Sequence, residues 1–133
     1  MSTHLLDTNH ASELLLGNEL LWDRMIADSF GGAALCRPSI GELWYMVYNS
    51  GRVAENRSGL ARMLRQFNVV EFDASAAHEY GRVRAELRQA GTSIPQIDIQ
   101  IGAIARVQGL VLLTSDAHFS YVADLQVESW LKP

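Results

Sequence analysis

The chain has 133 residues, 48% of them apolar, and a formal charge of −4, which fits one globular domain, 1–133, with its own core. This composition excludes a disordered acidic tail, and no apolar stretch is long enough to span a bilayer. No secretory signal is expected, because a basic start followed by an apolar run is missing. Cys36 is the only cysteine, so an internal disulfide is excluded, and we expect a buried thiol in a reducing, cytoplasmic setting.

Apolar periodicity predicts strands alternating with helices. Strands are expected at 3–7, 33–36, 69–72, 110–113 and, at an edge, 127–130. Helices are expected through Leu14–Leu16 and over 19–29, 39–49, 53–67, 74–89 and 97–107. The alternation predicts an α/β fold in which helices cover both faces of a parallel sheet. In such folds the ligand site lies beyond the carboxyl ends of the strands.

Four carboxylates fall where that site would lie. Asp7 ends the first strand and Asp116 follows the strand at 110–113, while Glu42 and Asp98 occupy the first turns of helices. Each acid also has a purely structural explanation. Asp7 could cap a helix, Asp98 could favour a helix dipole, and Asp116 could belong to a turn. Glu42, three residues after Ser39, could complete a capping box.

Asp98 stands out because it interrupts the apolar segment IPQIDIQIGAIA, where a carboxylate needs a partner. If the four acids converge, they repel one another, and two unit charges about 4 Å apart interact at roughly 4 kcal/mol at an effective dielectric of 20. A divalent cation would remove that repulsion. Carboxylate oxygens are the ligands that Mg²⁺ and Mn²⁺ prefer.

The order of these segments resembles that of PIN-domain ribonucleases, especially VapC-type toxins of VapBC toxin–antitoxin pairs. The matching motifs, in chain order, are LLDTN, SIGEL, IPQIDIQIGAIA, LLTSDAHF and VADLQVESW, so the resemblance runs from about residue 4 to residue 130. Each motif is short, but their order and separation are fairly specific. The resemblance implies a PIN-like three-layer fold with a mostly parallel central sheet.

The resemblance also implies an endoribonuclease that uses Mg²⁺ or Mn²⁺ and leaves a 5′-phosphate and a 3′-hydroxyl. Asp7 and Asp98 would be the central metal ligands, and Glu42 and Asp116 would complete the site directly or through water. The side chains that would hold these carboxylates by hydrogen bonds are Thr8, Asn9, Ser39 and Thr114. Action through one metal or two stays open.

One position departs from the family pattern. Many members carry an acid just before the final phenylalanine, where this chain has His118. We expect His118 to be an exposed loop side chain, with contact to metal or substrate as the alternative. The other histidines are not expected to bind metal; they are His4, His10 and His78.

RNA binding needs cations, and ten of the eleven basic residues are arginines, which suit phosphate contacts. The candidates for RNA contact are Arg82, Arg84 and Arg88, with a second group of Arg57, Arg62 and Arg65; a solvated helix face is the alternative for both. The resemblance further implies an antitoxin partner and a homodimer. The apolar segment from Leu14 to Ile26 could serve such an interface, although core packing is favoured. The aromatic residues expected mainly in the core are Trp44, Tyr45 and Tyr48.

Two other functions compete with this hypothesis. A haloacid-dehalogenase-like phosphatase would need a second aspartate where Asn9 stands, and a catalytic lysine; the only lysine is Lys132. A catalytically silent PIN-like binding scaffold would not need the acids, all four of which are present. Binding of Mn²⁺ discriminates between a scaffold and a nuclease.

Overall fold

The computed structural model describes residues 2–28 and 32–131. Its sheet has five strands in the order β3-β2-β1-β4-β5, and every neighbouring pair is parallel. The strands are β1 (His4–Leu6), β2 (Ala33–Cys36), β3 (Asn68–Val70), β4 (Val111–Leu113) and β5 (Val127–Glu128). The parallel sheet predicted from the alternation of elements is confirmed.

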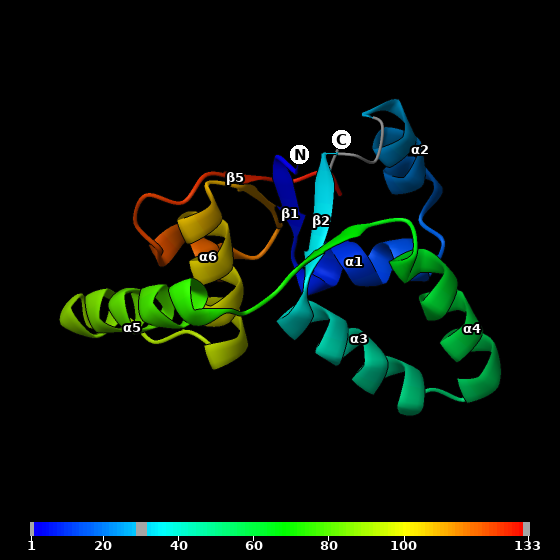
Figure 1. The fold of residues 1–133 in the computed structure, drawn as a ribbon, viewed down its shortest axis with the longest axis horizontal. Helices are drawn as coiled ribbons and strands as arrows, with labels where there is room; N and C mark the ends of the chain where they lie inside the picture. Colours follow the sequence, from blue (N-terminus) through cyan, green and yellow to red (C-terminus); the bar gives the residue numbers. More distant parts are fainter. Residues whose placement is uncertain (1, 29–31, 132–133) are drawn as a thin grey trace.

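Helices cover both faces of this sheet (Figure 1). On one face lie α1 (Thr8–Leu15), α2 (Glu19–Ala27), α3 (Arg37–Tyr48) and α4 (Val53–Leu64). On the other face lie α5 (Ala74–Gln89), α6 (Gln96–Gln108) and the short 3₁₀ helix η1 (Ala117–Tyr121). This arrangement is the expected three-layer α/β fold. Within the described ranges, no helix has the length and apolar character needed to cross a membrane.

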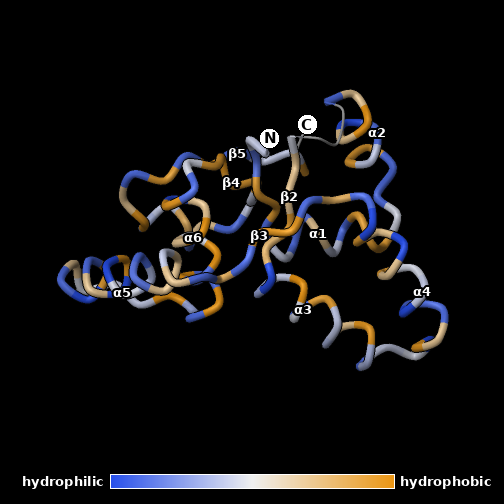
Figure 2. The backbone as a smooth tube through the Cα atoms, viewed as in Figure 1, coloured by the Kyte–Doolittle hydropathy of each residue, from blue (hydrophilic) through white to orange (hydrophobic). Residues whose placement is uncertain are grey.

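The strands divide the core into two layers, because successive side chains point to opposite faces of a sheet. Leu6, Leu35 and Leu113 pack against α1–α4. Their neighbours Leu5, Ala34 and Leu112 pack against α5 and α6. The central strands β2 and β4 are accordingly hydrophobic, whereas the outer helix α5 is largely hydrophilic (Figure 2). Helix α6 buries six of its 13 residues, among them the unbroken run 101–105, as its apolar sequence predicts.

Helix α3 begins two residues earlier than predicted, at Arg37 instead of Ser39. The cap residue is Cys36, whose side chain makes no capping bond, and Pro38 lies in the first turn, where its fixed φ favours helix. Ser39 is therefore buried inside the first turn, and its hydroxyl accepts a hydrogen bond from Thr8. The capping-box explanation for Glu42 is wrong for this reason. Cys36 is fully buried as expected, and burial raises the pKa of its thiol.

The prediction that Tyr45 and Tyr48 belong to the core is wrong. Their side chains are 65% and 60% exposed, because α3 packs through Leu43 and Val47 on its opposite face. Trp44 is partly buried against the core, as predicted.

The apolar segment from Leu14 to Ile26 is divided between core and surface. Leu14, Leu21 and Met25 are buried, and Leu15 and Trp22 are partly buried. The remaining large apolar side chains of this segment, Leu16, Leu20 and Ile26, are exposed. Core packing therefore holds for part of the segment, and an interface at its exposed side chains stays a prediction.

The sheet has a switch point between β1 and β4. From β1 the chain moves outward through β2 to β3, then crosses back to place β4 on the other side of β1. Asp7 directly follows β1, and Asp116 lies three residues beyond β4. Side chains at the carboxyl ends of two strands at a switch point border the crevice where α/β folds bind ligands.

Candidate functional site

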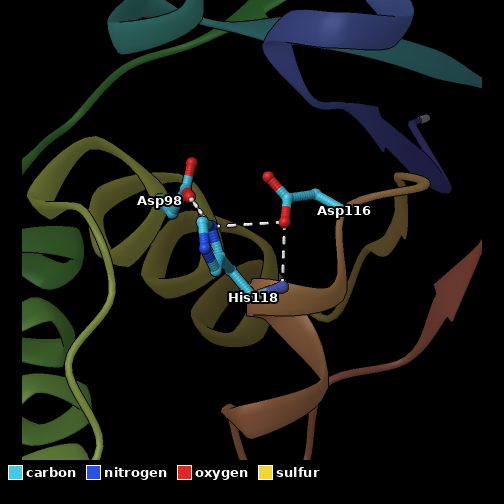
Figure 3. Close-up of side chains that lie close together, drawn as sticks. All are labelled: Asp98, Asp116 and His118. Carbon is cyan, nitrogen blue, oxygen red and sulfur yellow. Dashed lines mark hydrogen bonds and ion pairs between the residues drawn. The ribbon is translucent and has the colours of Figure 1, made fainter.

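Two of the predicted acids meet directly at this end of the sheet. Asp98, in the first turn of α6, and Asp116, before η1, lie on either side of His118 (Figure 3). Nδ1 of His118 is 3.0 Å from Oδ2 of Asp98 and 3.2 Å from Oδ1 of Asp116. One donor atom from each of the three side chains lies within 4.8 Å of the others, the spacing expected of groups that share a cation.

Local structure explains how the loop after β4 holds this geometry. Asp116 caps η1 by accepting a hydrogen bond from the backbone N–H of His118 at 2.9 Å. The backbone N–H of Asp116 donates to Oγ1 of Thr114, which is buried. Phe119 anchors the turn by packing into the core beside α6. The loop is therefore fixed at both ends, and the side chains of Asp116 and His118 leave it in a defined direction.

Each of these two carboxylates has one oxygen that is not engaged by His118. His118 occupies Oδ2 of Asp98 and Oδ1 of Asp116. Within the part of the chain that the structure describes, no hydrogen bond reaches the other oxygen of either group. In Figure 3 these second oxygens point away from the imidazole. They are the atoms available to a cation.

Asp7 lies nearby and is 3% exposed. Oδ1 of Asp7 accepts a hydrogen bond from the backbone N–H of His10 at 2.7 Å. Asp7 therefore caps α1, which is the structural role considered for it in the sequence. Nδ1 of His10 is 3.2 Å from the same oxygen. No hydrogen bond from the described residues reaches Oδ2. Capping thus uses one oxygen and leaves the second free, so the two explanations for Asp7 are compatible.

The electrostatics of Asp98 show that these acids affect one another. Burial raises the pKa of Asp98, and the negative charges of Asp116 and Asp7 raise it further. The hydrogen bond from His118 and its charge lower the pKa and offset part of this rise. A carboxylate under this repulsion gains from a nearby cation, as its position in the apolar segment led us to expect.

Asp7 and Glu42 both lie outside the group of Asp98, Asp116 and His118, whose donor atoms come within 4.8 Å of one another. Glu42 is partly exposed on α3, and no hydrogen bond or ion pair joins it to the described residues. Helix α3 does begin beside α1, since Oγ1 of Thr8 donates to Oγ of Ser39 at 3.3 Å. Thr8 and Ser39 thus bond to each other, and their predicted hydrogen bonds to the carboxylates stay a prediction. Asn9 is exposed and makes no side-chain hydrogen bond with the described residues.

Two histidines contribute more than the sequence suggested. His118, expected as an exposed loop side chain, is 44% exposed and engages both carboxylates. His10, expected to be uninvolved, is fully buried against Asp7. The available signals were the spacings of His118 two residues after Asp116 and of His10 three residues after Asp7. His4 contacts Trp130, and His78 is exposed on α5.

The predicted RNA-contacting arginines differ in their surroundings. Arg82 donates to Glu79 at 3.0 Å and is thereby engaged in an ion pair. Arg84 and Arg88 line a pocket of about 430 Å³ that also contains Gln96, two residues before Asp98. Arg84 and Arg88 are therefore placed beside the start of α6, and the Arg84 guanidinium donates to the Tyr80 hydroxyl at 3.2 Å.

Comparison with known proteins agrees with this architecture. The PIN-domain family model matches residues 4–125. Ribonuclease VapC2 of Haemophilus influenzae is 26% identical over 132 residues, which are 98% of this chain and all of the relative. The tRNA(fMet)-specific endonuclease VapC of Shigella flexneri is 29% identical over 101 residues, covering 75% of this chain and 76% of the relative.

Among solved structures, the DNA-bound VapBC complex of Salmonella typhimurium contains a chain that superposes with a TM-score of 0.93 at 25% identity, covering 98% of this chain and 99% of that one. A chain of the Rickettsia felis VapBC2 complex superposes with a TM-score of 0.88, also at 25% identity, covering 96% of this chain and 98% of that one. The family match spans nearly the whole described sheet and the residues of the acidic cluster. The chain belongs to the PIN-domain family.

Proposed function

We propose that this protein is an endoribonuclease that requires Mg²⁺ or Mn²⁺ and acts as the toxin of a toxin–antitoxin pair. The observation that carries the proposal is the cluster of Asp98, Asp116 and His118 beside the switch point, with the charge of Asp7 acting on Asp98. Each of the three aspartates has one carboxylate oxygen that accepts no hydrogen bond from the described residues. The names of the relatives, ribonuclease and tRNA-specific endonuclease, support RNA as the substrate. Because cellular RNA is the proposed substrate, the cytoplasm is the proposed setting.

The residues fit a divalent cation of the oxygen-preferring kind. Asp7, Asp98 and Asp116 would bind it through their free oxygens, and Glu42 would complete the site through water. When bound, such a cation lowers the pKa of a water ligand and offsets charge on the phosphate that is attacked. His118 contacts both Asp98 and Asp116 and would keep these two carboxylates oriented toward a shared cation.

The remaining residues orient the ligands and the RNA. Thr114 fixes the loop of Asp116, and the bond between Thr8 and Ser39 fixes α1 relative to α3. Arg84 and Arg88 would bind phosphates of the RNA beside the acids, since arginine pairs with phosphate through two parallel hydrogen bonds.

The partners of this toxin would be a cognate antitoxin protein and a second copy of the chain. The solved VapBC complexes support the antitoxin. Large exposed apolar side chains occur in two segments: Leu16, Leu20 and Ile26 in and before α2, and Tyr45, Met46 and Tyr48 on α3. Exposed apolar and aromatic side chains of this kind are candidates for protein interfaces.

The deciding experiment measures cleavage of a defined RNA by the purified chain with Mg²⁺ or Mn²⁺, together with Mn²⁺ binding by calorimetry. We expect the wild type to cleave RNA and to bind Mn²⁺, and we expect EDTA to abolish cleavage. Asp7→Asn and Asp98→Asn should lose both cleavage and Mn²⁺ binding. Asp23→Asn, on the exposed face of α2, is the matched control and should behave as wild type.

Two outcomes would contradict the proposal. Cleavage that survives both substitutions would place the chemistry elsewhere. A wild-type chain that neither binds Mn²⁺ nor cleaves RNA would favour the binding scaffold. The effect of Glu42→Gln on RNA cleavage and on Mn²⁺ binding decides whether Glu42 belongs to the site.

A further inference from the structure

His10 is an ionisable side chain buried completely within the described fold, beside the carboxylate of Asp7. It belongs to the first turn of α1, and its backbone N–H donates to Oδ1 of Asp7 at 2.7 Å. Its ring atom Nδ1 lies 3.2 Å from the same oxygen. One carboxylate oxygen thus faces two nitrogen atoms of a single residue.

The other ring nitrogen defines where the imidazole hydrogen lies. The backbone N–H of Trp130 donates to Nε2 of His10 at 3.1 Å, across 120 residues of sequence. An atom that accepts a hydrogen bond presents a lone pair, so the ring hydrogen is on Nδ1. Nδ1–H therefore donates to Asp7, and the ring cannot turn over without losing both bonds.

Trp130 is itself fixed from several elements. Its indole is 9% exposed, and Nε1 donates to Oε1 of Glu128 at 3.1 Å. The guanidinium carbon of Arg24, on α2, lies 4.4 Å from the ring centroid, and the ring of His4, on β1, lies 5.3 Å away. The backbone N–H that orients His10 thus belongs to a residue that cannot easily shift.

We infer that His10 is a positioning residue for Asp7: it donates to Oδ1 and turns Oδ2 toward the cation site, while Trp130 holds the imidazole in the tautomer that can donate. This inference rests on the proposed function, in which Asp7 is a metal ligand. Hydrogen bonds from neighbouring groups orient metal-binding carboxylates and histidines, and their loss typically weakens metal affinity by about 10- to 100-fold.

Helix capping alone does not explain the imidazole. The cap needs only the backbone N–H of His10, which any residue except proline supplies. A buried ring with two polar nitrogens is costly unless both are hydrogen bonded, and an apolar side chain would fill the same space without that requirement. Both ring nitrogens are satisfied here, one by Asp7 and one by Trp130.

Three variants separate the two bonds of His10. In His10→Asn, the amide nitrogen can take the place of Nδ1 and donate to Asp7, but the side chain is too short to reach Trp130. In His10→Gln, the amide oxygen can take the place of Nε2 and accept from Trp130, but no donor faces Asp7. His10→Leu removes both bonds and keeps the volume.

The measurements are the Mn²⁺ dissociation constant by calorimetry and kcat and KM for a defined RNA. We expect Mn²⁺ to bind about 10- to 100-fold more weakly to His10→Leu and His10→Gln, with kcat reduced and KM for RNA nearly unchanged. His10→Asn should stay within a few-fold of wild type. Thermal unfolding in EDTA verifies that each variant is folded, and if His10→Leu does not fold, the Asn and Gln pair decides.

The tautomer gives a readout that needs no metal. Nitrogen NMR of the imidazole in EDTA should show the hydrogen on Nδ1 of His10; a hydrogen on Nε2 would overturn the inference. Equal Mn²⁺ affinity in wild type and folded His10→Leu, or an equal loss in Asn and Gln, would overturn it as well. Failure of the wild type to bind Mn²⁺ would instead overturn the proposed function, and this role with it.

Discussion

The imidazole Nδ1 of His118 lies 3.0 Å from Oδ2 of Asp98 and offsets part of the effect that burial has on this carboxyl group. Burial is the largest influence and raises the pKa of Asp98, while the His118 bond lowers it. The acidic cluster is therefore held together by a nitrogen at the one position where the chain departs from the acid that many family members carry.

His118→Ala should raise the pKa of Asp98 above its value in the wild type, because burial and the neighbouring acids then act without opposition. Carbon NMR titration of the Asp98 carboxyl in EDTA measures this change. His78→Ala, which alters an exposed histidine on α5, serves as the control. If the pKa of Asp98 stays constant or falls in His118→Ala, then the hydrogen bond from His118 does not lower this pKa.

The raised pKa of Asp98 also predicts how stability depends on pH without metal. The folded chain holds this proton more tightly than the unfolded chain does, so folding is penalised as pH rises above the ordinary value of 3.8, and fully so above the folded pKa. Asp98→Asn removes the penalty. Calorimetry in EDTA should give a higher Tm for Asp98→Asn at pH 7, with a difference that shrinks as pH approaches 3.8 from above.

Asp23→Asn is the control for this comparison of Tm values. It removes one negative charge from an exposed position, so it measures the effect of the changed net charge alone. A Tm of Asp98→Asn below that of wild type at pH 7 would mean that the aspartate stabilises the metal-free fold.

Arg106 joins α6 to α5 through a partly buried ion-pair network. Its guanidinium donates to the buried carboxylate of Glu79 at 2.6 Å and to Glu86 at 2.8 and 3.0 Å. Glu79→Ala leaves this guanidinium with one acid fewer and should lower the free energy of unfolding by about 2–4 kcal/mol in urea denaturation. The expected range starts below the usual cost of about 3–5 kcal/mol for breaking a buried pair, because Glu86 remains as a partner of Arg106.

Glu71→Ala is the matched control for that change. It breaks the ion pair between Glu71 and Arg37, whose side chains are 59% and 54% exposed, so solvent screens the interaction. The urea midpoint should move far less than in Glu79→Ala. Equal shifts in the two variants would argue that burial adds nothing to the Arg106 network.

Arg84→Ala and Arg88→Ala should weaken RNA binding without changing the chemical step. We expect KM for RNA to rise about 3- to 10-fold for each variant at nearly constant kcat, with a salt dependence that becomes shallower by about one unit for each phosphate that the variant no longer binds. Steady-state cleavage at several salt concentrations measures both effects. Arg82→Ala is the comparison, because Arg82 is paired with Glu79 and should matter less. If kcat falls in these variants while KM stays constant, then the two arginines do not contribute to RNA binding.

The local pattern was sufficient for most of the fold. Apolar runs and their periodicity predicted the parallel sheet and the buried helix α6. Errors arose where a local signal competed with another. Ser39 was predicted to cap its helix, but the helix begins earlier, at Arg37, because Pro38 favours the first helical turn. At Tyr45 and Tyr48, aromatic character was mistaken for burial, although the helix needed only one face for the core.

The sequence by itself determined which acids stand at the ends of strands and helices, because strand and helix boundaries are local properties. It could not determine which of them meet. Only the tertiary structure places Asp98 beside Asp116, leaves Asp7 and Glu42 outside this cluster, and inserts His118 between the two carboxylates. The bond from Trp130 to His10 spans 120 residues. Such contacts depend on how the crossovers and the two core layers pack, which no short segment of the chain contains.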